Sequence, residues 1–390
     1  MLKSSISKIK IASILLSGVF VAALCSAEDN VLPSPNFSGY MSVASINSTR
    51  YETTRNDVSA ETGLGVTWDP LQHVSSAMGV RGTPGNYNGE SLIDYAYVDI
   101  NASVGYNTSY GVRLGRNKVI YGFYNGARVN PSARPTFILL QSVYWNVFND
   151  IADNIDGYQL YLNTVLTNNG NFEIMHSVGN LVASPRNVHE IDELFYHGAG
   201  FTGNFEIKKP SYSTVVRYEQ APFEVQYSFA QVEYHKDVDF PASMFVPAHS
   251  IKTKTHQVGF RVDVPNWTAV TEMLYLQPST SLDNTQFFSR IGYYGLVQYQ
   301  RGKIRFSAAY SRGSSVHDGL HEAQDINEAK ITTDLMFSVK YNLDKGWHVI
   351  AEIHNMAGSL GVRRDLNPDF TNVYDSERWK QYVVNVGYDF

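Results

Sequence analysis

Cysteine and long apolar runs are almost missing from this chain. Its 390 residues include a single cysteine, Cys25, so no disulfide can form within one copy of the chain. After the apolar stretch from Ile11 to Leu24, no segment approaches the ~20 apolar residues that a membrane-spanning helix needs. A disulfide-stabilised scaffold and a helical membrane protein are therefore excluded.

The chain also has few proline residues, and fewer basic than acidic residues. The chain has 14 proline residues against 29 glycine, 26 tyrosine and 20 phenylalanine residues, and its net charge is −6. Glycine and aromatic residues suit strands and tight turns. The composition therefore favours an all-β protein: a membrane barrel, a large secreted sandwich or a solenoid. The excess of acidic residues argues against nucleic acid as a partner.

The N-terminus carries an export pattern. Three lysines within the first ten residues precede the apolar stretch, and small residues lead up to Ala27. We expect a signal peptide at 1–27 and a short periplasmic segment at 28–36. A lipoprotein with Cys25 as the lipidated residue is the alternative, which the bulky Leu24 before it disfavours.

Apolar and polar residues alternate along the rest of the chain. In 223–229, phenylalanine, valine and tyrosine occupy the odd positions, whereas Glu224, Gln226 and Ser228 occupy the even ones. Such period-two runs predict half-buried strands with one apolar face. We expect strands at 37–46, 59–68, 73–81, 91–101, 109–116, 156–166, 171–178, 211–219, 223–235, 253–264, 267–276, 291–300, 304–311, 331–341, 347–354 and 379–390. A further strand within 198–207 is left open.

The connections between these strands alternate in length. Short ones such as 265–266 and 301–303 carry hairpin-turn residues, whereas 236–252 and 355–378 are long and polar. Short turns on one side and long loops on the other are typical of a transmembrane β-barrel. We predict an antiparallel up-and-down barrel of about sixteen strands over 37–390.

Aromatic residues lie beside the short turns, on the apolar face of their own strands. They are Trp68, Phe172, Phe223, Trp267, Tyr299, Tyr341 and Trp347. Outward aromatic side chains at a common height form the interfacial girdle of a membrane barrel. We predict that all of these except Phe172 contribute to a membrane girdle, with outer-membrane lipid and lipopolysaccharide as partners.

The last strand ends with Tyr388 and a terminal Phe390, in an alternating apolar pattern. This ending resembles the C-terminal assembly signal of bacterial outer-membrane barrels. The resemblance implies that the barrel-assembly machinery is a partner. Together with the export pattern, it predicts a location in the outer membrane of a Gram-negative bacterium.

Residues 91–163 contain the run Tyr95-Ala96-Tyr97-Val98-Asp99, followed by the triplet Gly115-Arg116-Asn117. These residues resemble the strand pair that leads into the constriction loop of the general porins of Gram-negative bacteria. By this resemblance, 117–155 is a third extracellular loop that folds inward. The resemblance further implies a homotrimer and a porin channel for passive diffusion of small polar solutes and ions.

The predicted size of the barrel also indicates a channel, because sixteen strands leave an aqueous lumen. The predicted lining and constriction residues are Arg113, Arg116, Arg128, Arg134, Asp150, Asp153, Glu61, Arg81 and Asp99. One hypothesis is that the arginines at 113, 116, 128 and 134 narrow the pore and favour anionic solutes, since guanidinium groups bind carboxylates through two hydrogen bonds. The alternative, which we favour because a loop inside a barrel needs such contacts, is that these arginines only hold the loop against wall carboxylates such as Asp99 and Glu61.

Enzyme sites find little support in the sequence. His317 and His321 stand four apart, as on a metal-binding helix, but they lie in a polar stretch without helical periodicity. We predict no enzyme activity, no metal site and no cofactor. Two other functions stay open: an adhesin or phage receptor that acts through long outer loops, and a substrate-specific channel that uses inward tyrosines such as Tyr95, Tyr97 and Tyr294.

Overall fold

The computed structural model describes most of the chain from residue 33 onward. The described residues are 33–49, 55–82, 93–125, 133–144, 154–167, 169–182, 204–206, 210–237, 250–280, 289–316, 330–358 and 378–390. The predicted signal peptide at 1–27 lies outside them, as does 28–32 of the predicted periplasmic segment. Those assignments stay predictions.

The described residues form β-strands joined by turns and irregular segments. The strands are β1 (Asn36–Ser48), β2 (Arg55–Leu71), β3 (Val74–Gly82), β4 (Ile93–Val104), β5 (Thr108–Lys118), β6 (Asn154–Val165), β7 (Asn171–Leu181), β8 (Asn204–Glu206), β9 (Ser211–Gln220), β10 (Phe223–Asp237), β11 (Ser250–Val264), β12 (Trp267–Thr280), β13 (Ser289–Arg301), β14 (Ile304–Val316), β15 (Lys330–Asn342), β16 (Trp347–Ala357) and β17 (Arg378–Asp389). Within the described ranges, no helix is long and apolar enough to cross a membrane.

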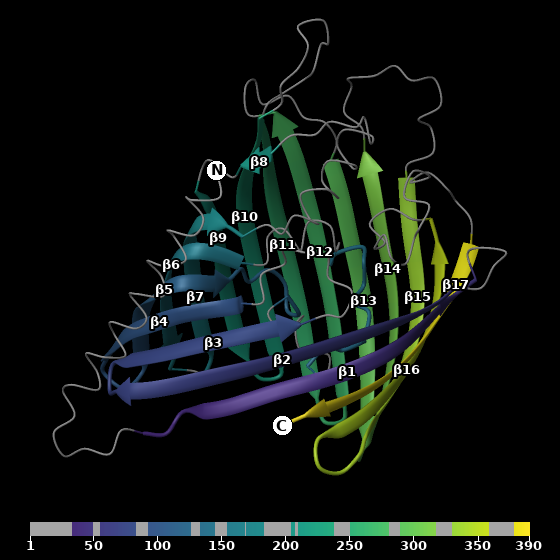
Figure 1. The fold of residues 1–390 in the computed structure, drawn as a ribbon, viewed down its shortest axis with the longest axis horizontal. Coiled ribbons are helices and arrows are strands. Elements are labelled where there is room, and N and C mark those ends of the chain that lie inside the picture. Colours follow the sequence, from purple (N-terminus) through teal and green to yellow (C-terminus); the bar gives the residue numbers. More distant parts are fainter. Residues whose placement is uncertain are drawn as a thin grey trace, which may run out of the picture.

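Sixteen of these strands form one closed antiparallel wall. Each strand pairs with the next along the chain, and β1 pairs with both β2 and β17, so the sheet closes on itself. The exception is β8, which pairs only with the far end of β10, while β7 pairs directly with β9. Figure 1 shows the strands tilted around the wall. The predicted sixteen-stranded barrel is confirmed, and a short strand does lie within 198–207.

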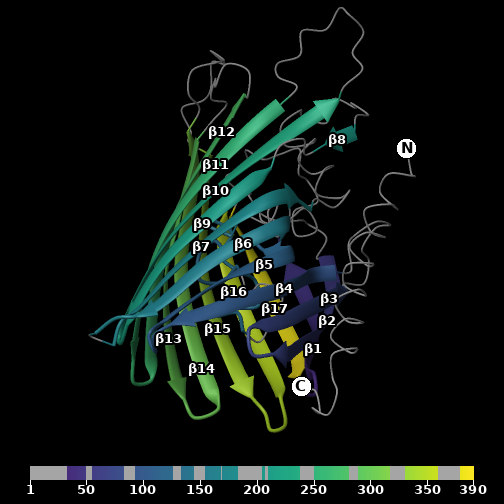
Figure 2. The same cartoon turned by 90° about the vertical axis from the view of Figure 1, so that its left-hand side faces the viewer.

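Tight turns join the strands at one end of the barrel. The β11–β12, β13–β14 and β15–β16 hairpins turn through Asn266, Gly302 and Gly346, with positive φ angles of 67°, 58° and 82°. Glycine and asparagine adopt this left-handed conformation at low cost, so these residue types set where each hairpin turns. The three turns lie together at the lower edge of Figure 2.

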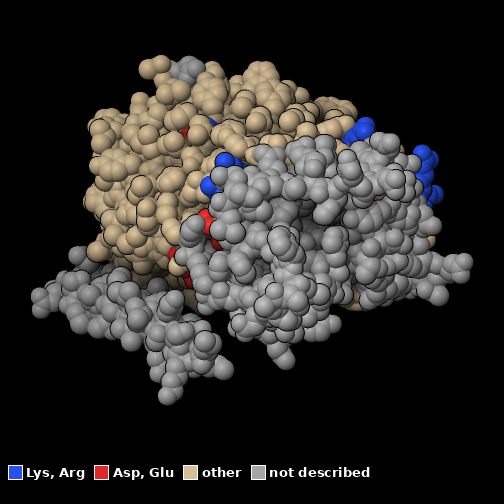
Figure 3. Space-filling model, turned by 90° about the horizontal axis from the view of Figure 1, so that it is seen from above, with Lys and Arg blue, Asp and Glu red and all other residues tan. Residues whose placement is uncertain are grey.

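The two faces of the wall differ in character. On β15, Phe337 and Val339 point outward and are 52% and 42% exposed, whereas Ser338 and Lys340 point inward and are buried. Successive strand side chains point to opposite faces, so the alternating sequence places apolar groups outside and polar groups inside. Seen from above, the visible described surface is mostly uncharged, with basic side chains at its edge (Figure 3).

Candidate functional site

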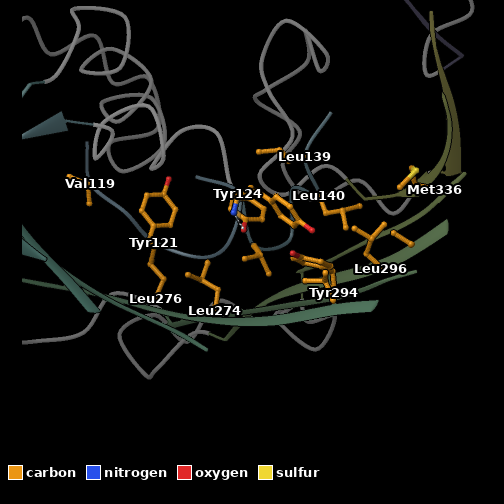
Figure 4. Packing of buried hydrophobic residues seen from close by; sticks show 14 of the residues in the cluster. Val119, Tyr121, Tyr124, Leu139, Leu140, Leu274, Leu276, Tyr294, Leu296 and Met336 are labelled. Carbon is orange, nitrogen blue, oxygen red and sulfur yellow. Dashed lines mark hydrogen bonds between the residues drawn. The ribbon is translucent and has the colours of Figure 1, made fainter. Parts of the chain in front are cut away.

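Two described parts of the β5–β6 connection, 119–125 and 133–144, contact the inner face of the wall. Tyr121, Leu140 and Val143 belong to one buried apolar cluster with Leu274 of β12 and Leu296 of β13. In the close-up, side chains from the connection point toward those of the wall strands (Figure 4). Burying apolar side chains between the two layers stabilises this contact by about 25 cal/mol per Å² removed from water.

A buried carboxylate of β12 binds the first of these segments. One oxygen of Glu272 accepts hydrogen bonds from the backbone N–H of Phe123, at 2.8 Å, and from the Gln257 amide, at 3.0 Å. The other oxygen accepts from the hydroxyls of Tyr144 and Tyr294. Burial raises the pKa of Tyr144 well above its usual value, so this hydroxyl stays protonated and donates to Glu272. Four donors offset the cost of burying the charge.

A second buried carboxylate binds the other segment in the same way. Glu352 of β16 accepts the backbone N–H groups of Phe137, at 2.6 Å, and Ile138, at 3.2 Å. His354 lies beside it, with its Nε2 3.3 Å from Glu352 and its Nδ1 2.8 Å from Asp334. Two wall carboxylates therefore satisfy backbone donors that the irregular segments would otherwise leave unpaired.

Two glycines let the segments approach the wall closely. A Cβ on Gly292 of β13 would lie 1.8 Å from the carbonyl oxygen of Ser142, which is far inside contact distance. Gly122 has a φ of 64°, and a Cβ there would lie 2.6 Å from Glu272. Residues with a side chain at either position would force the segment away from the wall.

The predicted lining residue Arg134 is bound by a wall carboxylate. Its guanidinium donates to Glu61 of β2 at 2.7 Å and to the carbonyl of Phe137 at 3.0 Å, and the side chain is 10% exposed. This contact is of the kind that the alternative interpretation proposed, with an arginine holding the connection against the wall. Most of the Arg134 charge is therefore neutralised locally.

Across the barrel, Arg113 of β5 lies on the inner face among polar and aromatic groups. It donates to Asp99 at 3.0 Å and to Gln159 at 2.8 Å. Its guanidinium carbon is 5.2 Å from the ring centre of Tyr97 and 4.9 Å from that of Tyr161. These contacts hold the arginine flat against the wall while 28% of its side chain stays exposed.

Arg116 was predicted to line the pore with Arg113, and the structure corrects this. It lies on the opposite face of β5, the same face as Leu114, and its guanidinium binds Asp156 of β6 at 2.8 and 3.0 Å. Residues three apart on a strand cannot point the same way, because side chains alternate. The triplet Gly115-Arg116-Asn117 therefore does not supply a pore arginine.

The other predicted lining residues are placed only in part. Arg81 lies on the inner face of β3, opposite Gly63 of β2. Arg128, Asp150 and Asp153 lie outside the described residues, so their roles stay predictions. Within the described ranges, no group of three or more histidine, cysteine, aspartate or glutamate side chains could hold a metal ion.

The predicted girdle residues lie on the outer face beside the tight turns. Those that are at least two-fifths exposed are Phe223, Trp267, Tyr341 and Trp347, whereas Trp68 and Tyr299 are half-buried. Ring centres of Trp267 and Tyr299 are 4.6 Å apart, and those of Trp347 and Tyr388 are 4.9 Å apart. The terminal Phe390 exchanges backbone hydrogen bonds of 2.9 and 3.0 Å with Gly39, which extends the β1–β17 closure to the last residue.

Sequence reasoning missed the groups that bind the two segments. Glu272 and Glu352 each occupy an inward position in the middle of a strand, which is the only signal that the sequence offers. Their partners Phe123 and Phe137 lie 149 and 215 residues away along the chain. No local pattern links such distant residues.

Proteins of known structure share the fold of this chain. No family model and no curated protein matches the sequence. The anion-selective porin from Comamonas acidovorans is similar in structure, at 13% identity and a TM-score of 0.61 over 92% of this chain and 99% of that one. OmpF of Salmonella typhi is 12% identical, with a TM-score of 0.57 over 91% of this chain and 97% of that one. The channel DcaP of Acinetobacter baumannii is also 12% identical, with a TM-score of 0.56 over 92% of this chain and 97% of that one. The chain therefore shares the fold of these outer-membrane proteins, a closed antiparallel β-barrel, which here has sixteen strands in its wall.

Proposed function

We propose that this chain forms a water-filled channel in the outer membrane, through which small hydrophilic solutes and ions diffuse. The observation that carries the proposal is the distribution of its side chains, with apolar groups on the outside and charged groups on the inside, the reverse of a water-soluble protein. Apolar groups such as Phe337 and Val384 are about half exposed on the outside, whereas charged groups such as Arg113 and Glu224 face inward. A lipid-facing outer wall and an aqueous interior are the environments that suit this arrangement.

The wall is wide enough for such a channel. Sixteen strands leave a lumen that side chains alone do not fill. Charged side chains that face water cost little, whereas an arginine or lysine on the lipid face costs about 2–4 kcal/mol near the membrane midplane. Inward charges also occur as pairs, such as Arg217 with Glu173 at 3.3 Å and with Glu224 at 3.2 Å.

We assign the constriction to the connection 117–155. Support comes from its two described segments, which contact the inner side of β2, β12 and β16 through Glu61, Glu272 and Glu352. The wall around Arg113 and Tyr97 lies on β4 and β5, across the barrel. The narrowest part of the bore then lies between these segments and that wall.

We further propose that the channel prefers anions. The arginine that supports this preference is not one of those predicted from the sequence. Arg113 and Arg134 are each paired with a carboxylate, and Arg116 points outward. Among the described inward arginines, Arg305 of β14 instead bonds to the neutral amide of Gln300, at 3.1 Å. Unbalanced positive charge on the bore then comes from Arg305.

The proposed partners follow from the same fold. We assign the protein to a homotrimer that the barrel-assembly machinery inserts, with lipid and lipopolysaccharide around its outer face. The aromatic side chains beside the tight turns support a membrane boundary at that level. Chemical cross-linking of the purified protein in detergent should give a band at three times the monomer mass, and a monomer band alone would contradict the trimer.

Liposome swelling tests the channel most simply. Liposomes that contain the purified full-length protein should swell in isosmotic arabinose and glucose, faster for the smaller sugar, and hardly at all in raffinose. Liposomes made with heat-denatured protein serve as the control. No swelling in any sugar by folded protein would contradict the channel and favour the adhesin or receptor alternative.

A further inference from the structure

A cavity lies between the β5–β6 connection and the tight-turn end of β11 to β14. Its volume is about 440 Å³, and its lining includes Tyr124, Pro135, Arg261, Gln298, Gln300 and Arg305. Turn residues Asn266 and Gly302 also line it, so the cavity lies at the end of the barrel where the short turns gather. A volume of this size falls within the range of small-molecule sites, roughly 300–1,000 Å³.

The two arginines of this cavity differ in how their charge is balanced. Arg261 lies 2.6 Å from Asp263 and 4.0 Å from Glu224. Arg305 donates to the side-chain oxygen of Gln300 from two nitrogens, at 3.1 and 3.4 Å. Among the residues that the structure describes, no carboxylate forms a salt bridge with Arg305. A neutral amide holds the guanidinium in place without cancelling its charge.

Arg305 has a second basic residue and an oriented amide as neighbours. Lys340 of β15 lies directly across from Arg305 in the strand register, and both point inward. Gln298 is oriented by its bonds to the carbonyl of Pro135, at 3.3 Å, and to Ser307, at 3.0 Å. The cavity therefore combines an unbalanced guanidinium, oriented amide groups and the ring of Tyr124.

We propose that this cavity is a binding site for small organic carboxylates, with Arg305 as its principal contact. A guanidinium presents two parallel N–H groups that match the two oxygens of a carboxylate. The amides of Gln298 and Gln300 supply further polar contacts, and Tyr124 and Pro135 supply an apolar surface for a short carbon chain. The inference rests on the proposed channel for the route by which a solute reaches the site.

Calorimetric titration of the folded full-length protein in detergent with citrate tests the site. We expect citrate to bind, and Arg305→Gln to weaken binding by about tenfold or more, because a charge-assisted pair is lost. Arg305→Lys keeps the charge and should weaken binding less. Choline, a small organic cation, should not bind. Circular dichroism checks that each variant folds.

Arg301→Gln is the matched control. Arg301 is exposed at the same end of the barrel, on β13, and lies outside the cavity lining. This variant removes the same charge and should leave citrate binding within about twofold of the original protein. If the original protein does not bind citrate, or if the 305 and 301 variants weaken binding equally, the site is wrong.

The outcomes separate the site from the channel. Citrate binding that depends on Arg305, in a protein that gives no liposome swelling, would contradict the channel and support the site. Swelling in sugars, together with citrate binding that does not change in the Arg305→Gln variant, would contradict the site and support the channel.

Discussion

At the scale of single residues, buried carboxylates act together with the buried apolar cluster to hold the β5–β6 connection against the wall. Glu272 is fully enclosed and accepts hydrogen bonds from two backbone or amide N–H groups and two hydroxyls. Each hydrogen bond to a charged group contributes about 1.5–3 kcal/mol, and an unsatisfied buried donor costs about 1–3 kcal/mol. Changing this one acceptor should therefore loosen the segment that it binds.

Glu272→Gln should speed hydrogen exchange at residues 119–125. The amide replaces one acceptor oxygen with a donor, which opposes the hydroxyls of Tyr144 and Tyr294. If the variant lowers the free energy of opening of this segment by about 1–3 kcal/mol, hydrogen exchange becomes roughly 5- to 150-fold faster. Mass spectrometry of the folded protein in detergent measures this rate. Glu173→Gln, an inward carboxylate of β7 that pairs with Arg217, should leave exchange in 119–125 unchanged.

A second residue-scale prediction concerns the outer face. Phe337 lies in the middle of β15 and is 52% exposed. Phe337→Arg should lower the free energy of unfolding in lipid vesicles by about 2–4 kcal/mol, because a cation would meet hydrocarbon. Urea titration followed by tryptophan fluorescence measures this loss, with Phe337→Leu as the apolar control. Equal stability of the two variants would mean that Phe337 does not face lipid.

At the scale of elements, the wall strands and the inward segments follow different rules. The strands are set by local alternation, so their number and nearly all their positions follow from the sequence. The β5–β6 connection is held by contacts such as Ser142 with Tyr293, at 3.1 Å across 151 residues, which no local pattern encodes. Arg116 was misplaced for a different reason. Its predicted role followed the motif resemblance, whereas the alternation of side chains along β5 places it on the outer face.

Gly292→Ala should displace the 141–144 segment toward the bore. The new methyl group would overlap the carbonyl of Ser142, and overpacking of this kind costs about 1–3 kcal/mol. We expect faster hydrogen exchange at 141–144 and a lower single-channel conductance. Gly295 lies on the same strand with open space around it. Gly295→Ala should therefore change neither quantity, and equal effects of both variants would contradict the close contact.

At the scale of the whole molecule, closure determines both stability and function. Pairing of β1 with β17 leaves no open edge among the described wall strands, so their backbone donors and acceptors are satisfied within the sheet. The closed wall then separates an apolar exterior from a polar interior. Which solutes pass depends on side chains that meet only in the folded barrel, such as Tyr144 beside Glu272, and sequence alone does not bring them together.

Single-channel recording in a planar lipid bilayer tests the central claim most directly. If a continuous aqueous bore runs through the sixteen-stranded wall, the purified protein should add discrete conductance steps. Their size should rise in proportion to KCl concentration, and a KCl gradient should give a reversal potential of the sign expected for anion preference. A folded protein that inserts into the bilayer yet carries no current would contradict the account.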